Sequence, residues 1–489
     1  MTSKHRKTRQ ARRQHLGRRR FLTQALAAPL LMPSWRIGGV SMSSLGAGIG
    51  VAKAQATGGP RSLVCLFLAG GADSFNFAVP SDSRYSDYLE TRSDLAIQDV
   101  DLVDVGGGLA LHRALPTFQR LYAERQLAVV ANVGPLARPT TQADFRDRRN
   151  IPESLFAHNT QQKLWQTAAN RVSGSSGFGW GGVMAEQVAR FNAGATIGGT
   201  FSLAGDNAWL AARDTRFTSL NPNIAIQRLY GLDPTVATWI NADSRVPVAE
   251  RLAALYRDTH GSDSLMAREA ADAVDSSLSS AASLYSALEE ADSPGAASAL
   301  QGWQANSANR LETQLHLVAR LIAARESLGL SRQVFFVRMG GWDTHSNQNE
   351  RFPVLLNELE SALAPFTQAL DGLGLADSVT TFTASDFGRT LTSNGNGTDH
   401  GWGGHAFVFG GAVQGGNLYG AMPEFTMNNN PNEASDGRGF AGRLIPTLSV
   451  NQYGATLARW MGVQDAELDA VFPGLANFTQ RDLGIFTPS

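Results

Sequence analysis

Three apolar runs, each closed by glycine or polar residues, constrain the fold of this chain more than any other feature. They span residues 63–68, 127–134 and 333–339, and residues 378–384 are expected to form a further strand. Apolar runs of this length, without alternating polar residues, are typical of strands buried on both faces. Between the first two runs, residues 115–126 have the apolar spacing of a helix. Because alternating strands and helices build parallel sheets with crossover helices, the sequence predicts an α/β fold.

The rest of the chain predicts one large domain with a helical insertion. Residues 266–327 are rich in Ala, Ser, Leu and Glu and are broken at Ser293-Pro294-Gly295, which predicts two long inserted helices that could form a cap. Further helices are expected over residues 351–373 and 451–461. No internal repeat or second linker interrupts the sequence, so we expect a single domain over residues 55–489.

The cysteine and tryptophan residues predict packing roles. Cys65 is the only cysteine, so no intramolecular disulfide can form. It lies inside the first apolar run, where a buried small hydrophobic residue is expected rather than a reactive thiol. Trp180, Trp342 and Trp402 are interpreted as packing residues as well. The stability of the domain should therefore come from its core.

The N-terminus has the pattern of an export signal. The first twenty residues contain nine Lys and Arg and no acidic residue. A modestly apolar stretch follows, which is too short to span a bilayer, since that takes ~20 residues. Arg18-Arg19, followed by Phe21-Leu22, resembles the twin-arginine consensus, and Ala52-Lys53-Ala54 offers a cleavage site.

We therefore expect a twin-arginine signal peptide over residues 1–54. The twin-arginine translocase would export the folded protein to the periplasm or the outside of the cell. The alternative, a basic tail that binds nucleic acid, needs neither Phe-Leu nor a cleavage site. The formal net charge of −1 includes the basic leader, so the remaining chain is acidic, which argues against a general nucleic-acid binder.

Carboxylate and imidazole side chains follow the predicted strands, where ligands bind in open α/β sheets. Glycine-rich residues 391–439 add two more imidazoles. Because these groups suit zinc, manganese or iron, the sequence predicts a metal site. For an aspartate after a strand, the alternative is a cap on the next helix. The candidate ligands are Asp73, Asp343, His345, Asp386, His400 and His405.

Several motifs resemble the DUF1501 family, a group of exported proteins similar to the alkaline phosphatase and sulfatase superfamily. The resemblance runs from Leu63 to the C-terminus. It implies an alkaline-phosphatase-like fold, with a mainly parallel sheet, helices on both faces and a helical insertion. The motifs include 67–73 (FLAGGAD), 340–345 (GGWDTH), 385–390 (SDFGRT) and 399–405 (DHGWGGH).

This resemblance implies a metal-dependent hydrolase of phosphate or sulfate esters. Asp73 would be a ligand from the first strand, and Asp386 would belong to one metal position. Asp343 and His345, with His400 or His405, would form the other position. Zinc is the first expectation for the divalent metal, with manganese, calcium or iron as alternatives.

The resemblance also implies a site for an anionic ester and a partner. Arg389 could neutralise an anionic ester oxygen. An exported protein of the DUF1800 type is the protein partner that the resemblance suggests.

Two departures leave the nucleophile open. Phe387 follows Asp386, where phosphatases have histidine, and Ala157 precedes His158, where many relatives have serine. His158 lies near the expected position of the nucleophile and is itself a candidate catalytic residue, with a structural hydrogen-bonding role as the alternative. Thr160, Thr140 or Thr141, or a water molecule activated by the metal, could then attack. A non-catalytic metal-binding, anion-binding or assembly protein of the cell envelope is the alternative function.

Overall fold

The computed structural model describes most of the chain after residue 57. It describes residues 35–37, 40–42, 58–169, 177–195, 197–223, 263–292, 300, 302–427, 430–435 and 442–487. The chain divides into two units, Met1–Trp35 and Arg36–Ser489, and the features below belong to the second. The twin-arginine motif and the cleavage site of the predicted signal peptide lie outside the described residues. No helix of the described part is long and apolar enough to cross a membrane.

A large mixed, mostly parallel sheet forms the centre of the second unit, so the α/β prediction is confirmed. Its strands follow the order β2-β9-β8-β10-β3-β11-β14-β7-β15, and β16 also pairs with β7. Strands β9, β8, β10, β3 and β11 are parallel to one another, whereas β14 runs antiparallel to both β11 and β7. These strands are β2 (Val40–Met42), β3 (Arg61–Leu68), β7 (Leu127–Gly134), β8 (Thr200–Ser202), β9 (Thr218–Leu220), β10 (Arg332–Met339), β11 (Val379–Ser385), β14 (Gly404–Phe409), β15 (Asn417–Tyr419) and β16 (Leu448–Ser449).

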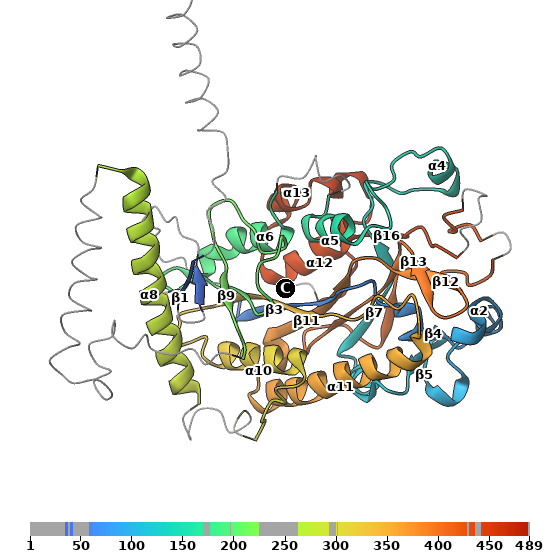
Figure 1. Cartoon of the computed structure of the whole chain (residues 1–489), viewed down its shortest axis with the longest axis horizontal. Coiled ribbons are helices and arrows are strands. Elements are labelled where there is room, and N and C mark those ends of the chain that lie inside the picture. Colours follow the sequence, from blue (N-terminus) through green and yellow to red (C-terminus); the bar gives the residue numbers. More distant parts are fainter. Residues whose placement is uncertain are drawn as a thin grey trace, which may run out of the picture. The chain divides into compact units, whose positions relative to one another are not determined.

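Helices cover both faces of this sheet (Figure 1). Along β3, Val64 and Leu66 face one hydrophobic core, whereas Cys65 and Phe67 face the other. The first core is covered by α3, α10 and α11, and the second by α5, α6 and α12. These helices are α3 (Pro116–Ala123), α5 (His158–Thr167), α6 (Trp180–Val188), α10 (Arg310–Ala323), α11 (Gln348–Gly372) and α12 (Val450–Met461).

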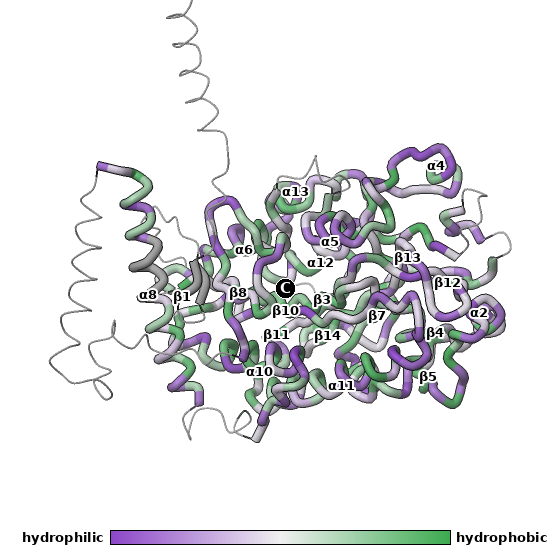
Figure 2. Tube along the Cα trace, in the orientation of Figure 1, coloured by the Kyte–Doolittle hydropathy of each residue, from purple (hydrophilic) through white to green (hydrophobic). Residues whose placement is uncertain are grey.

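The predicted packing residues are buried. Cys65 is buried in the second core, as expected. Trp180, Trp342 and Trp402 are almost wholly inaccessible to solvent, which confirms them as packing residues. By contrast, α2 (Arg84–Arg92) and α4 (Gln142–Arg146) lie at the periphery, where Figure 2 shows many hydrophilic residues.

In the predicted insertion over residues 266–327, the described residues include the helices α8 (Leu265–Ala291) and α10. The break expected at Ser293-Pro294-Gly295 lies outside the described residues. The cap interpretation does not fit α10, because Leu315 and Val318 pack in the same core as Phe335 of β10. The apolar stripe of this helix therefore belongs to the layer that covers the sheet.

Smaller elements complete the described part and carry some of the site residues. Strands β4, β6 and β5 form a three-stranded antiparallel sheet, and β12 pairs with β13. Their bounds are β4 (Ala78–Pro80), β5 (Leu102–Gly106), β6 (Leu109–His112), β12 (Arg389–Ser393) and β13 (Thr398–His400). The remaining elements are α13 (Leu468–Val471) and β1 (Trp35–Ile37), whose first residue belongs to the first unit.

Candidate metal centre

Imidazole and carboxylate groups from distant segments meet beyond the carboxyl ends of β10 and β11. Asp343 and His345 lie in the turn after β10, and Asp386 follows β11 directly. His158 begins α5, and His400 ends β13. One ligand atom each from His158, Asp343 and His400 lie within 4.8 Å of one another. The structure thus brings together five residues whose separation in the sequence reaches 242 positions between His158 and His400.

Glycine makes the close approach of two of these loops possible. Gly70, after β3, has a φ of +121°, and a Cβ atom at this position would lie 2.5 Å from the backbone nitrogen of Asp343. Its own backbone N–H donates to Asp386 Oδ1 at 3.1 Å. A side chain here would collide with the turn that carries Asp343, so glycine is needed where the ends of β3, β10 and β11 converge.

Two of the imidazoles have their Nδ1 atoms occupied by protein acceptors. His158 Nδ1 lies 2.7 Å from Asp386 Oδ2, and His400 Nδ1 lies 2.6 Å from the Phe156 carbonyl oxygen. A carboxylate or carbonyl oxygen only accepts, so the proton of each neutral ring is on Nδ1 and the lone pair is on Nε2. The histidines that bind metals in proteins are commonly oriented in this way.

The third imidazole brings its Nε2 atom against that of the second. His345 Nδ1 lies 3.2 Å from Asp399 Oδ1, which places its proton on Nδ1 as well. His345 Nε2 and His400 Nε2 are only 2.7 Å apart, and both lie 3.3 Å from Asp343 Oδ1. Two lone pairs and a carboxylate oxygen repel one another at these distances, so the arrangement requires a cation, either a proton or a metal ion.

The protonation states of Asp343 and His400 near pH 7 favour the binding of a metal cation. Burial raises the pKa of the Asp343 carboxyl group, but hydrogen bonding and charge from Arg389 outweigh this effect, and the pKa is lowered. Burial lowers the pKa of His400, with a smaller contribution from nearby Arg389 in the same direction. The carboxylate is therefore ionised and the His400 imidazole neutral near pH 7, as metal ligands must be.

Asp386 and Arg389 form the buried base of the site. Asp386 is fully buried and accepts a further hydrogen bond from Gln162 Nε2 at 2.9 Å. The Arg389 guanidinium is also fully buried and donates to the carbonyl oxygens of Gly70, Gly71, Trp342 and Thr398 and to the Asp343 carboxylate. The predicted contact of Arg389 with a substrate oxygen does not fit this burial; Arg389 orients Asp343 instead.

Phe156, whose carbonyl oxygen contacts His400, has an unusual backbone conformation, with a φ of +82°. An aromatic residue in this left-handed region is strained, and such strain is found chiefly where function or binding requires it. Its carbonyl oxygen holds His400, and its ring lies 4.2 Å from the guanidinium carbon of Arg443. The loop before α5 thus fixes the orientation of His400.

Two predicted ligands lie in other surroundings. Asp73 is buried and pairs with Arg92, and Gln348 Nε2 donates to the same carboxylate oxygen, Asp73 Oδ2, at 2.5 Å. His405 is buried, and its Nδ1 atom accepts from the backbone N–H of Asn132 at 3.3 Å. Neither side chain joins the imidazole cluster, because Asp73 turns toward α2 and His405 lies edge-on to a core phenylalanine.

The predicted nucleophiles make local hydrogen bonds. Thr160 contacts Asn159 on the same helix, and Thr141 caps α4. The Thr140 hydroxyl donates to the Arg138 carbonyl oxygen. Ala157 is the N-cap residue of α5, directly before His158, and has no side-chain group to offer. Among the described residues, these hydroxyl groups form no contact with the imidazole cluster that would mark one as the nucleophile.

Sequence reasoning missed three groups of the site. Gln162 lies four residues after His158, which places both on one face of a helix, and this spacing could have indicated it. Asp399 is the neighbour of His400 and was overlooked as a partner of His345. The Phe156 carbonyl oxygen is a backbone group, so no residue type could have revealed it.

Comparisons with known proteins identify a family and distant solved structures. A family model described as "Protein of unknown function (DUF1501)" matches residues 60–472. No curated protein matches the chain. A solved structure titled "Crystal structure of Ps i-CgsB in complex with k-i-k-neocarrahexaose" is 8% identical over 85% of this chain and 74% of that chain, with a TM-score of 0.28. A likeness of this size carries no argument about fold or activity.

Proposed function

This chain belongs to the DUF1501 family of proteins of unknown function, and from that premise we propose that it is an exported, metal-dependent hydrolase of phosphate or sulfate esters. One observation carries the proposal. Three imidazoles, each with an acceptor on Nδ1, direct their Nε2 atoms toward one another or toward the Asp343 carboxylate. This is the donor arrangement of a metal site in proteins.

The donor chemistry fits a transition-metal ion. Imidazole nitrogen and carboxylate oxygen suit zinc, manganese or iron, whereas calcium prefers oxygen ligands alone. Zinc remains the first choice for His345, His400, His158 and Asp343. The cation would replace the proton that the contact between His345 and His400 otherwise requires.

Exposure favours a catalytic site over a closed structural one. The side chains of Asp343 and His345 are 46% and 42% exposed, so solvent and a ligand can reach the donor atoms. Structural zinc sites are closed, whereas catalytic sites keep an open position. A divalent ion held here would polarise an ester oxygen and lower the pKa of a water molecule.

The chain supplies a positioning partner for each of the four donors. Fixed partners hold ligands in one orientation and tune their basicity. His158 is held by Asp386, His345 by Asp399, His400 by the Phe156 carbonyl oxygen, and Asp343 by Arg389.

Fold and location form part of the same proposal. The site lies beyond the carboxyl ends of neighbouring parallel strands, which supports an alkaline-phosphatase-like arrangement of the sheet. The twin-arginine pattern at Arg18-Arg19 supports export to the periplasm or beyond, and a chain exported folded can acquire its metal first. A partner of the DUF1800 type stays a prediction from the family resemblance.

Metal analysis tests the proposal. We expect the purified chain, produced without a metal-binding tag, to contain about one divalent ion per molecule by elemental mass spectrometry. Asp343→Asn and His400→Gln should lose the ion, because each removes a donor. His316→Gln, on α10 and outside the cluster, is the matched control and should keep it. The loaded protein should then release nitrophenol from p-nitrophenyl phosphate or p-nitrophenyl sulfate.

The same experiment separates the alternative function. The lack of a hydroxyl group at Ala157 favours a non-catalytic metal-binding or assembly protein as the second candidate. Such a protein would bind the ion and lose thermal stability in Asp343→Asn, with no ester turnover to lose. A chain that stays free of metal after supplementation with zinc, manganese and iron would contradict both metal-dependent functions and leave an anion-binding protein.

A further inference from the structure

A pocket lies along the same edge of the sheet as the candidate metal centre. It has a volume of about 690 Å³, within the size range of pockets that bind small molecules. Its walls include Leu203–Gly205 after β8, Asn221–Asn223 after β9 and Gly340 after β10. Because these three strands are parallel, the pocket lies beyond their carboxyl ends, where α/β sheets bind ligands.

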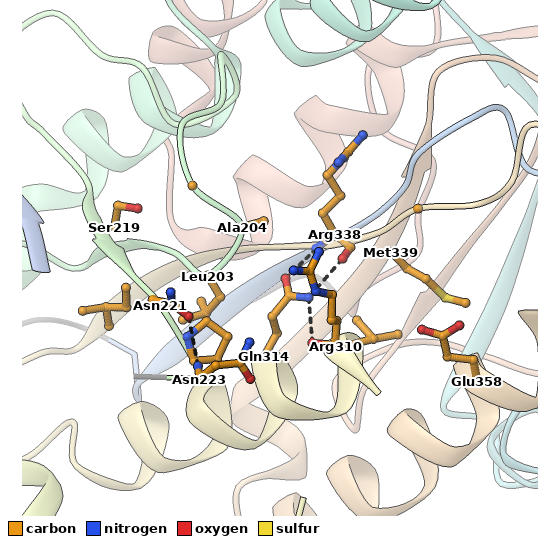
Figure 3. A pocket seen from close by; sticks show the side chains of 15 residues that line it. Leu203, Ala204, Ser219, Asn221, Asn223, Arg310, Gln314, Arg338, Met339 and Glu358 are labelled. Carbon is orange, nitrogen blue, oxygen red and sulfur yellow. Dashed lines mark hydrogen bonds between the residues drawn. The ribbon is translucent and has the colours of Figure 1, made fainter. Parts of the chain in front are cut away.

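One wall of this pocket carries two arginines that a buried glutamine holds in place. Gln314 donates to the carbonyl oxygens of Arg310 and Arg338 at 2.9 and 3.0 Å and accepts from the Arg338 backbone N–H at 2.9 Å (Figure 3). These bonds clamp the start of α10 to the end of β10. The two arginine backbones are therefore fixed on the same wall of the pocket.

The guanidinium groups on this wall are available to a ligand. Arg310 and Arg338 are both exposed, and in the described part of the chain neither side chain forms a hydrogen bond or ion pair. Glu358, at the far end of the view in Figure 3, is the single carboxylate among the lining residues. The pocket therefore has an excess of positive charge, with donors suited to bidentate contact with an anion.

The rest of the lining is polar with an apolar floor. Asn221 and Asn223 present amide groups, and Ser219 presents a hydroxyl group, on the side away from Glu358 (Figure 3). Leu203 and Met339 are buried and form apolar parts of the lining. Amides beside an apolar surface suit a ligand that has hydroxyl groups on one side and carbon-bound hydrogens on another, such as a sugar ring.

We infer that this pocket binds an anionic sugar, a monosaccharide-sized ligand that carries a carboxylate or sulfate group. The anionic group would meet Arg310, and the Arg338 side chain, which leaves β10 on the side away from Arg310 (Figure 3), would add positive charge nearby. The ring would lie between the asparagines and the apolar floor. Binding here needs no metal ion, so the inference goes beyond the proposed hydrolase and does not rest on it.

Titration of the metal-stripped full chain tests the inference. We expect D-glucuronate or glucose 6-sulfate to bind in isothermal titration calorimetry, whereas glucose, which lacks the charge, should bind far more weakly. Arg310→Gln should weaken the binding about tenfold, because it removes charge-assisted hydrogen bonds, and Arg338→Gln should weaken it less, because it removes only a nearby positive charge. The matched control is Arg138→Gln, an exposed arginine outside the pocket, which should bind like the unaltered chain.

The result also distinguishes the two kinds of anion. Binding of glucuronate alone identifies a carboxylate ligand, and binding of glucose 6-sulfate alone identifies a sulfated one. The inference is overturned if neither anionic sugar binds at millimolar concentration, if glucose binds equally well, or if both pocket variants bind like Arg138→Gln. Since the protein is free of metal in this assay, failure here leaves the metal centre untouched.

Discussion

Burial decides what the His405 imidazole can do. The side chain is buried, its Nδ1 atom accepts from the Asn132 backbone, and its Nε2 atom finds no hydrogen-bond partner among the described residues. Burial lowers the pKa of His405 from 6.5 to about 3. Taking a proton would place a charge in the core, so the folded protein keeps this imidazole neutral.

Because of His405, the free energy of unfolding should decrease as the pH is lowered. Below pH 6.5 the unfolded chain takes up a proton that the folded chain refuses until about pH 3, so the stability present above pH 6.5 is lost as the pH falls through that window. At pH 5 the loss is about 2 kcal/mol. His405→Gln keeps an acceptor for Asn132 and should flatten the dependence by that amount in urea unfolding at pH 7 and pH 5. Parallel curves for the two proteins would contradict this prediction.

At the scale of elements, a buried ion pair joins the end of β3 to α2. Asp73 follows β3, and Arg92 ends α2, and both side chains are fully buried. Arg92 also donates to the carbonyl oxygens of Thr390 and Leu391 in β12. The pair of Asp73 and Arg92 therefore holds the end of β3, α2 and β12 together, although the position of Asp73 after a strand predicted a metal ligand.

Removing the Arg92 side chain should destabilise the fold without changing the metal content of the folded protein. Arg92→Met leaves the Asp73 carboxylate buried without its charge partner, which should cost about 3–5 kcal/mol in chemical unfolding. Metal content per folded molecule should stay unchanged. The double variant with Asp73→Asn should recover part of the loss, because no uncompensated charge remains. A loss of metal in Asp73→Asn alone would instead restore Asp73 as a ligand.

At the scale of the whole molecule, the proposed function links export to metal acquisition. If the chain is exported folded, it can bind a metal ion beforehand, when the loops after β3, β10 and β11 have already come together. The nine basic residues of the leader would direct that step. Lysine carries the same charge as arginine, so a strict need for arginine at the pair Arg18-Arg19 would be specific for the twin-arginine translocase.

Replacing the arginine pair should therefore stop export. In cells that produce the full chain, Arg18→Lys with Arg19→Lys should retain the protein in the cytoplasm, as measured by fractionation and immunoblotting. Arg12→Lys with Arg13→Lys is the matched control and should be exported normally. Equal export of both variants would rule out the twin-arginine route.

The sequence by itself determined the fold class, the main strands and the family. The apolar runs at residues 63–68 and 333–337 are typical of strands buried on both faces, so these two central strands could be predicted from hydrophobicity alone. The same reasoning identified the burial of Cys65. It also indicated where Asp343, His345 and Asp386 would lie, because the carboxyl ends of parallel strands share one edge of a sheet.

Only the tertiary structure decided which of these groups meet. Asp73 and Asp386 both follow buried strands, yet one faces Arg92 and the other faces His158, because the direction of a side chain depends on loop geometry that residue type does not encode. The tautomers of the three imidazoles depend on acceptors as distant as Phe156 and Asp399. Distance and orientation across the fold, rather than composition or spacing, decide whether histidines near one another in space can share a cation.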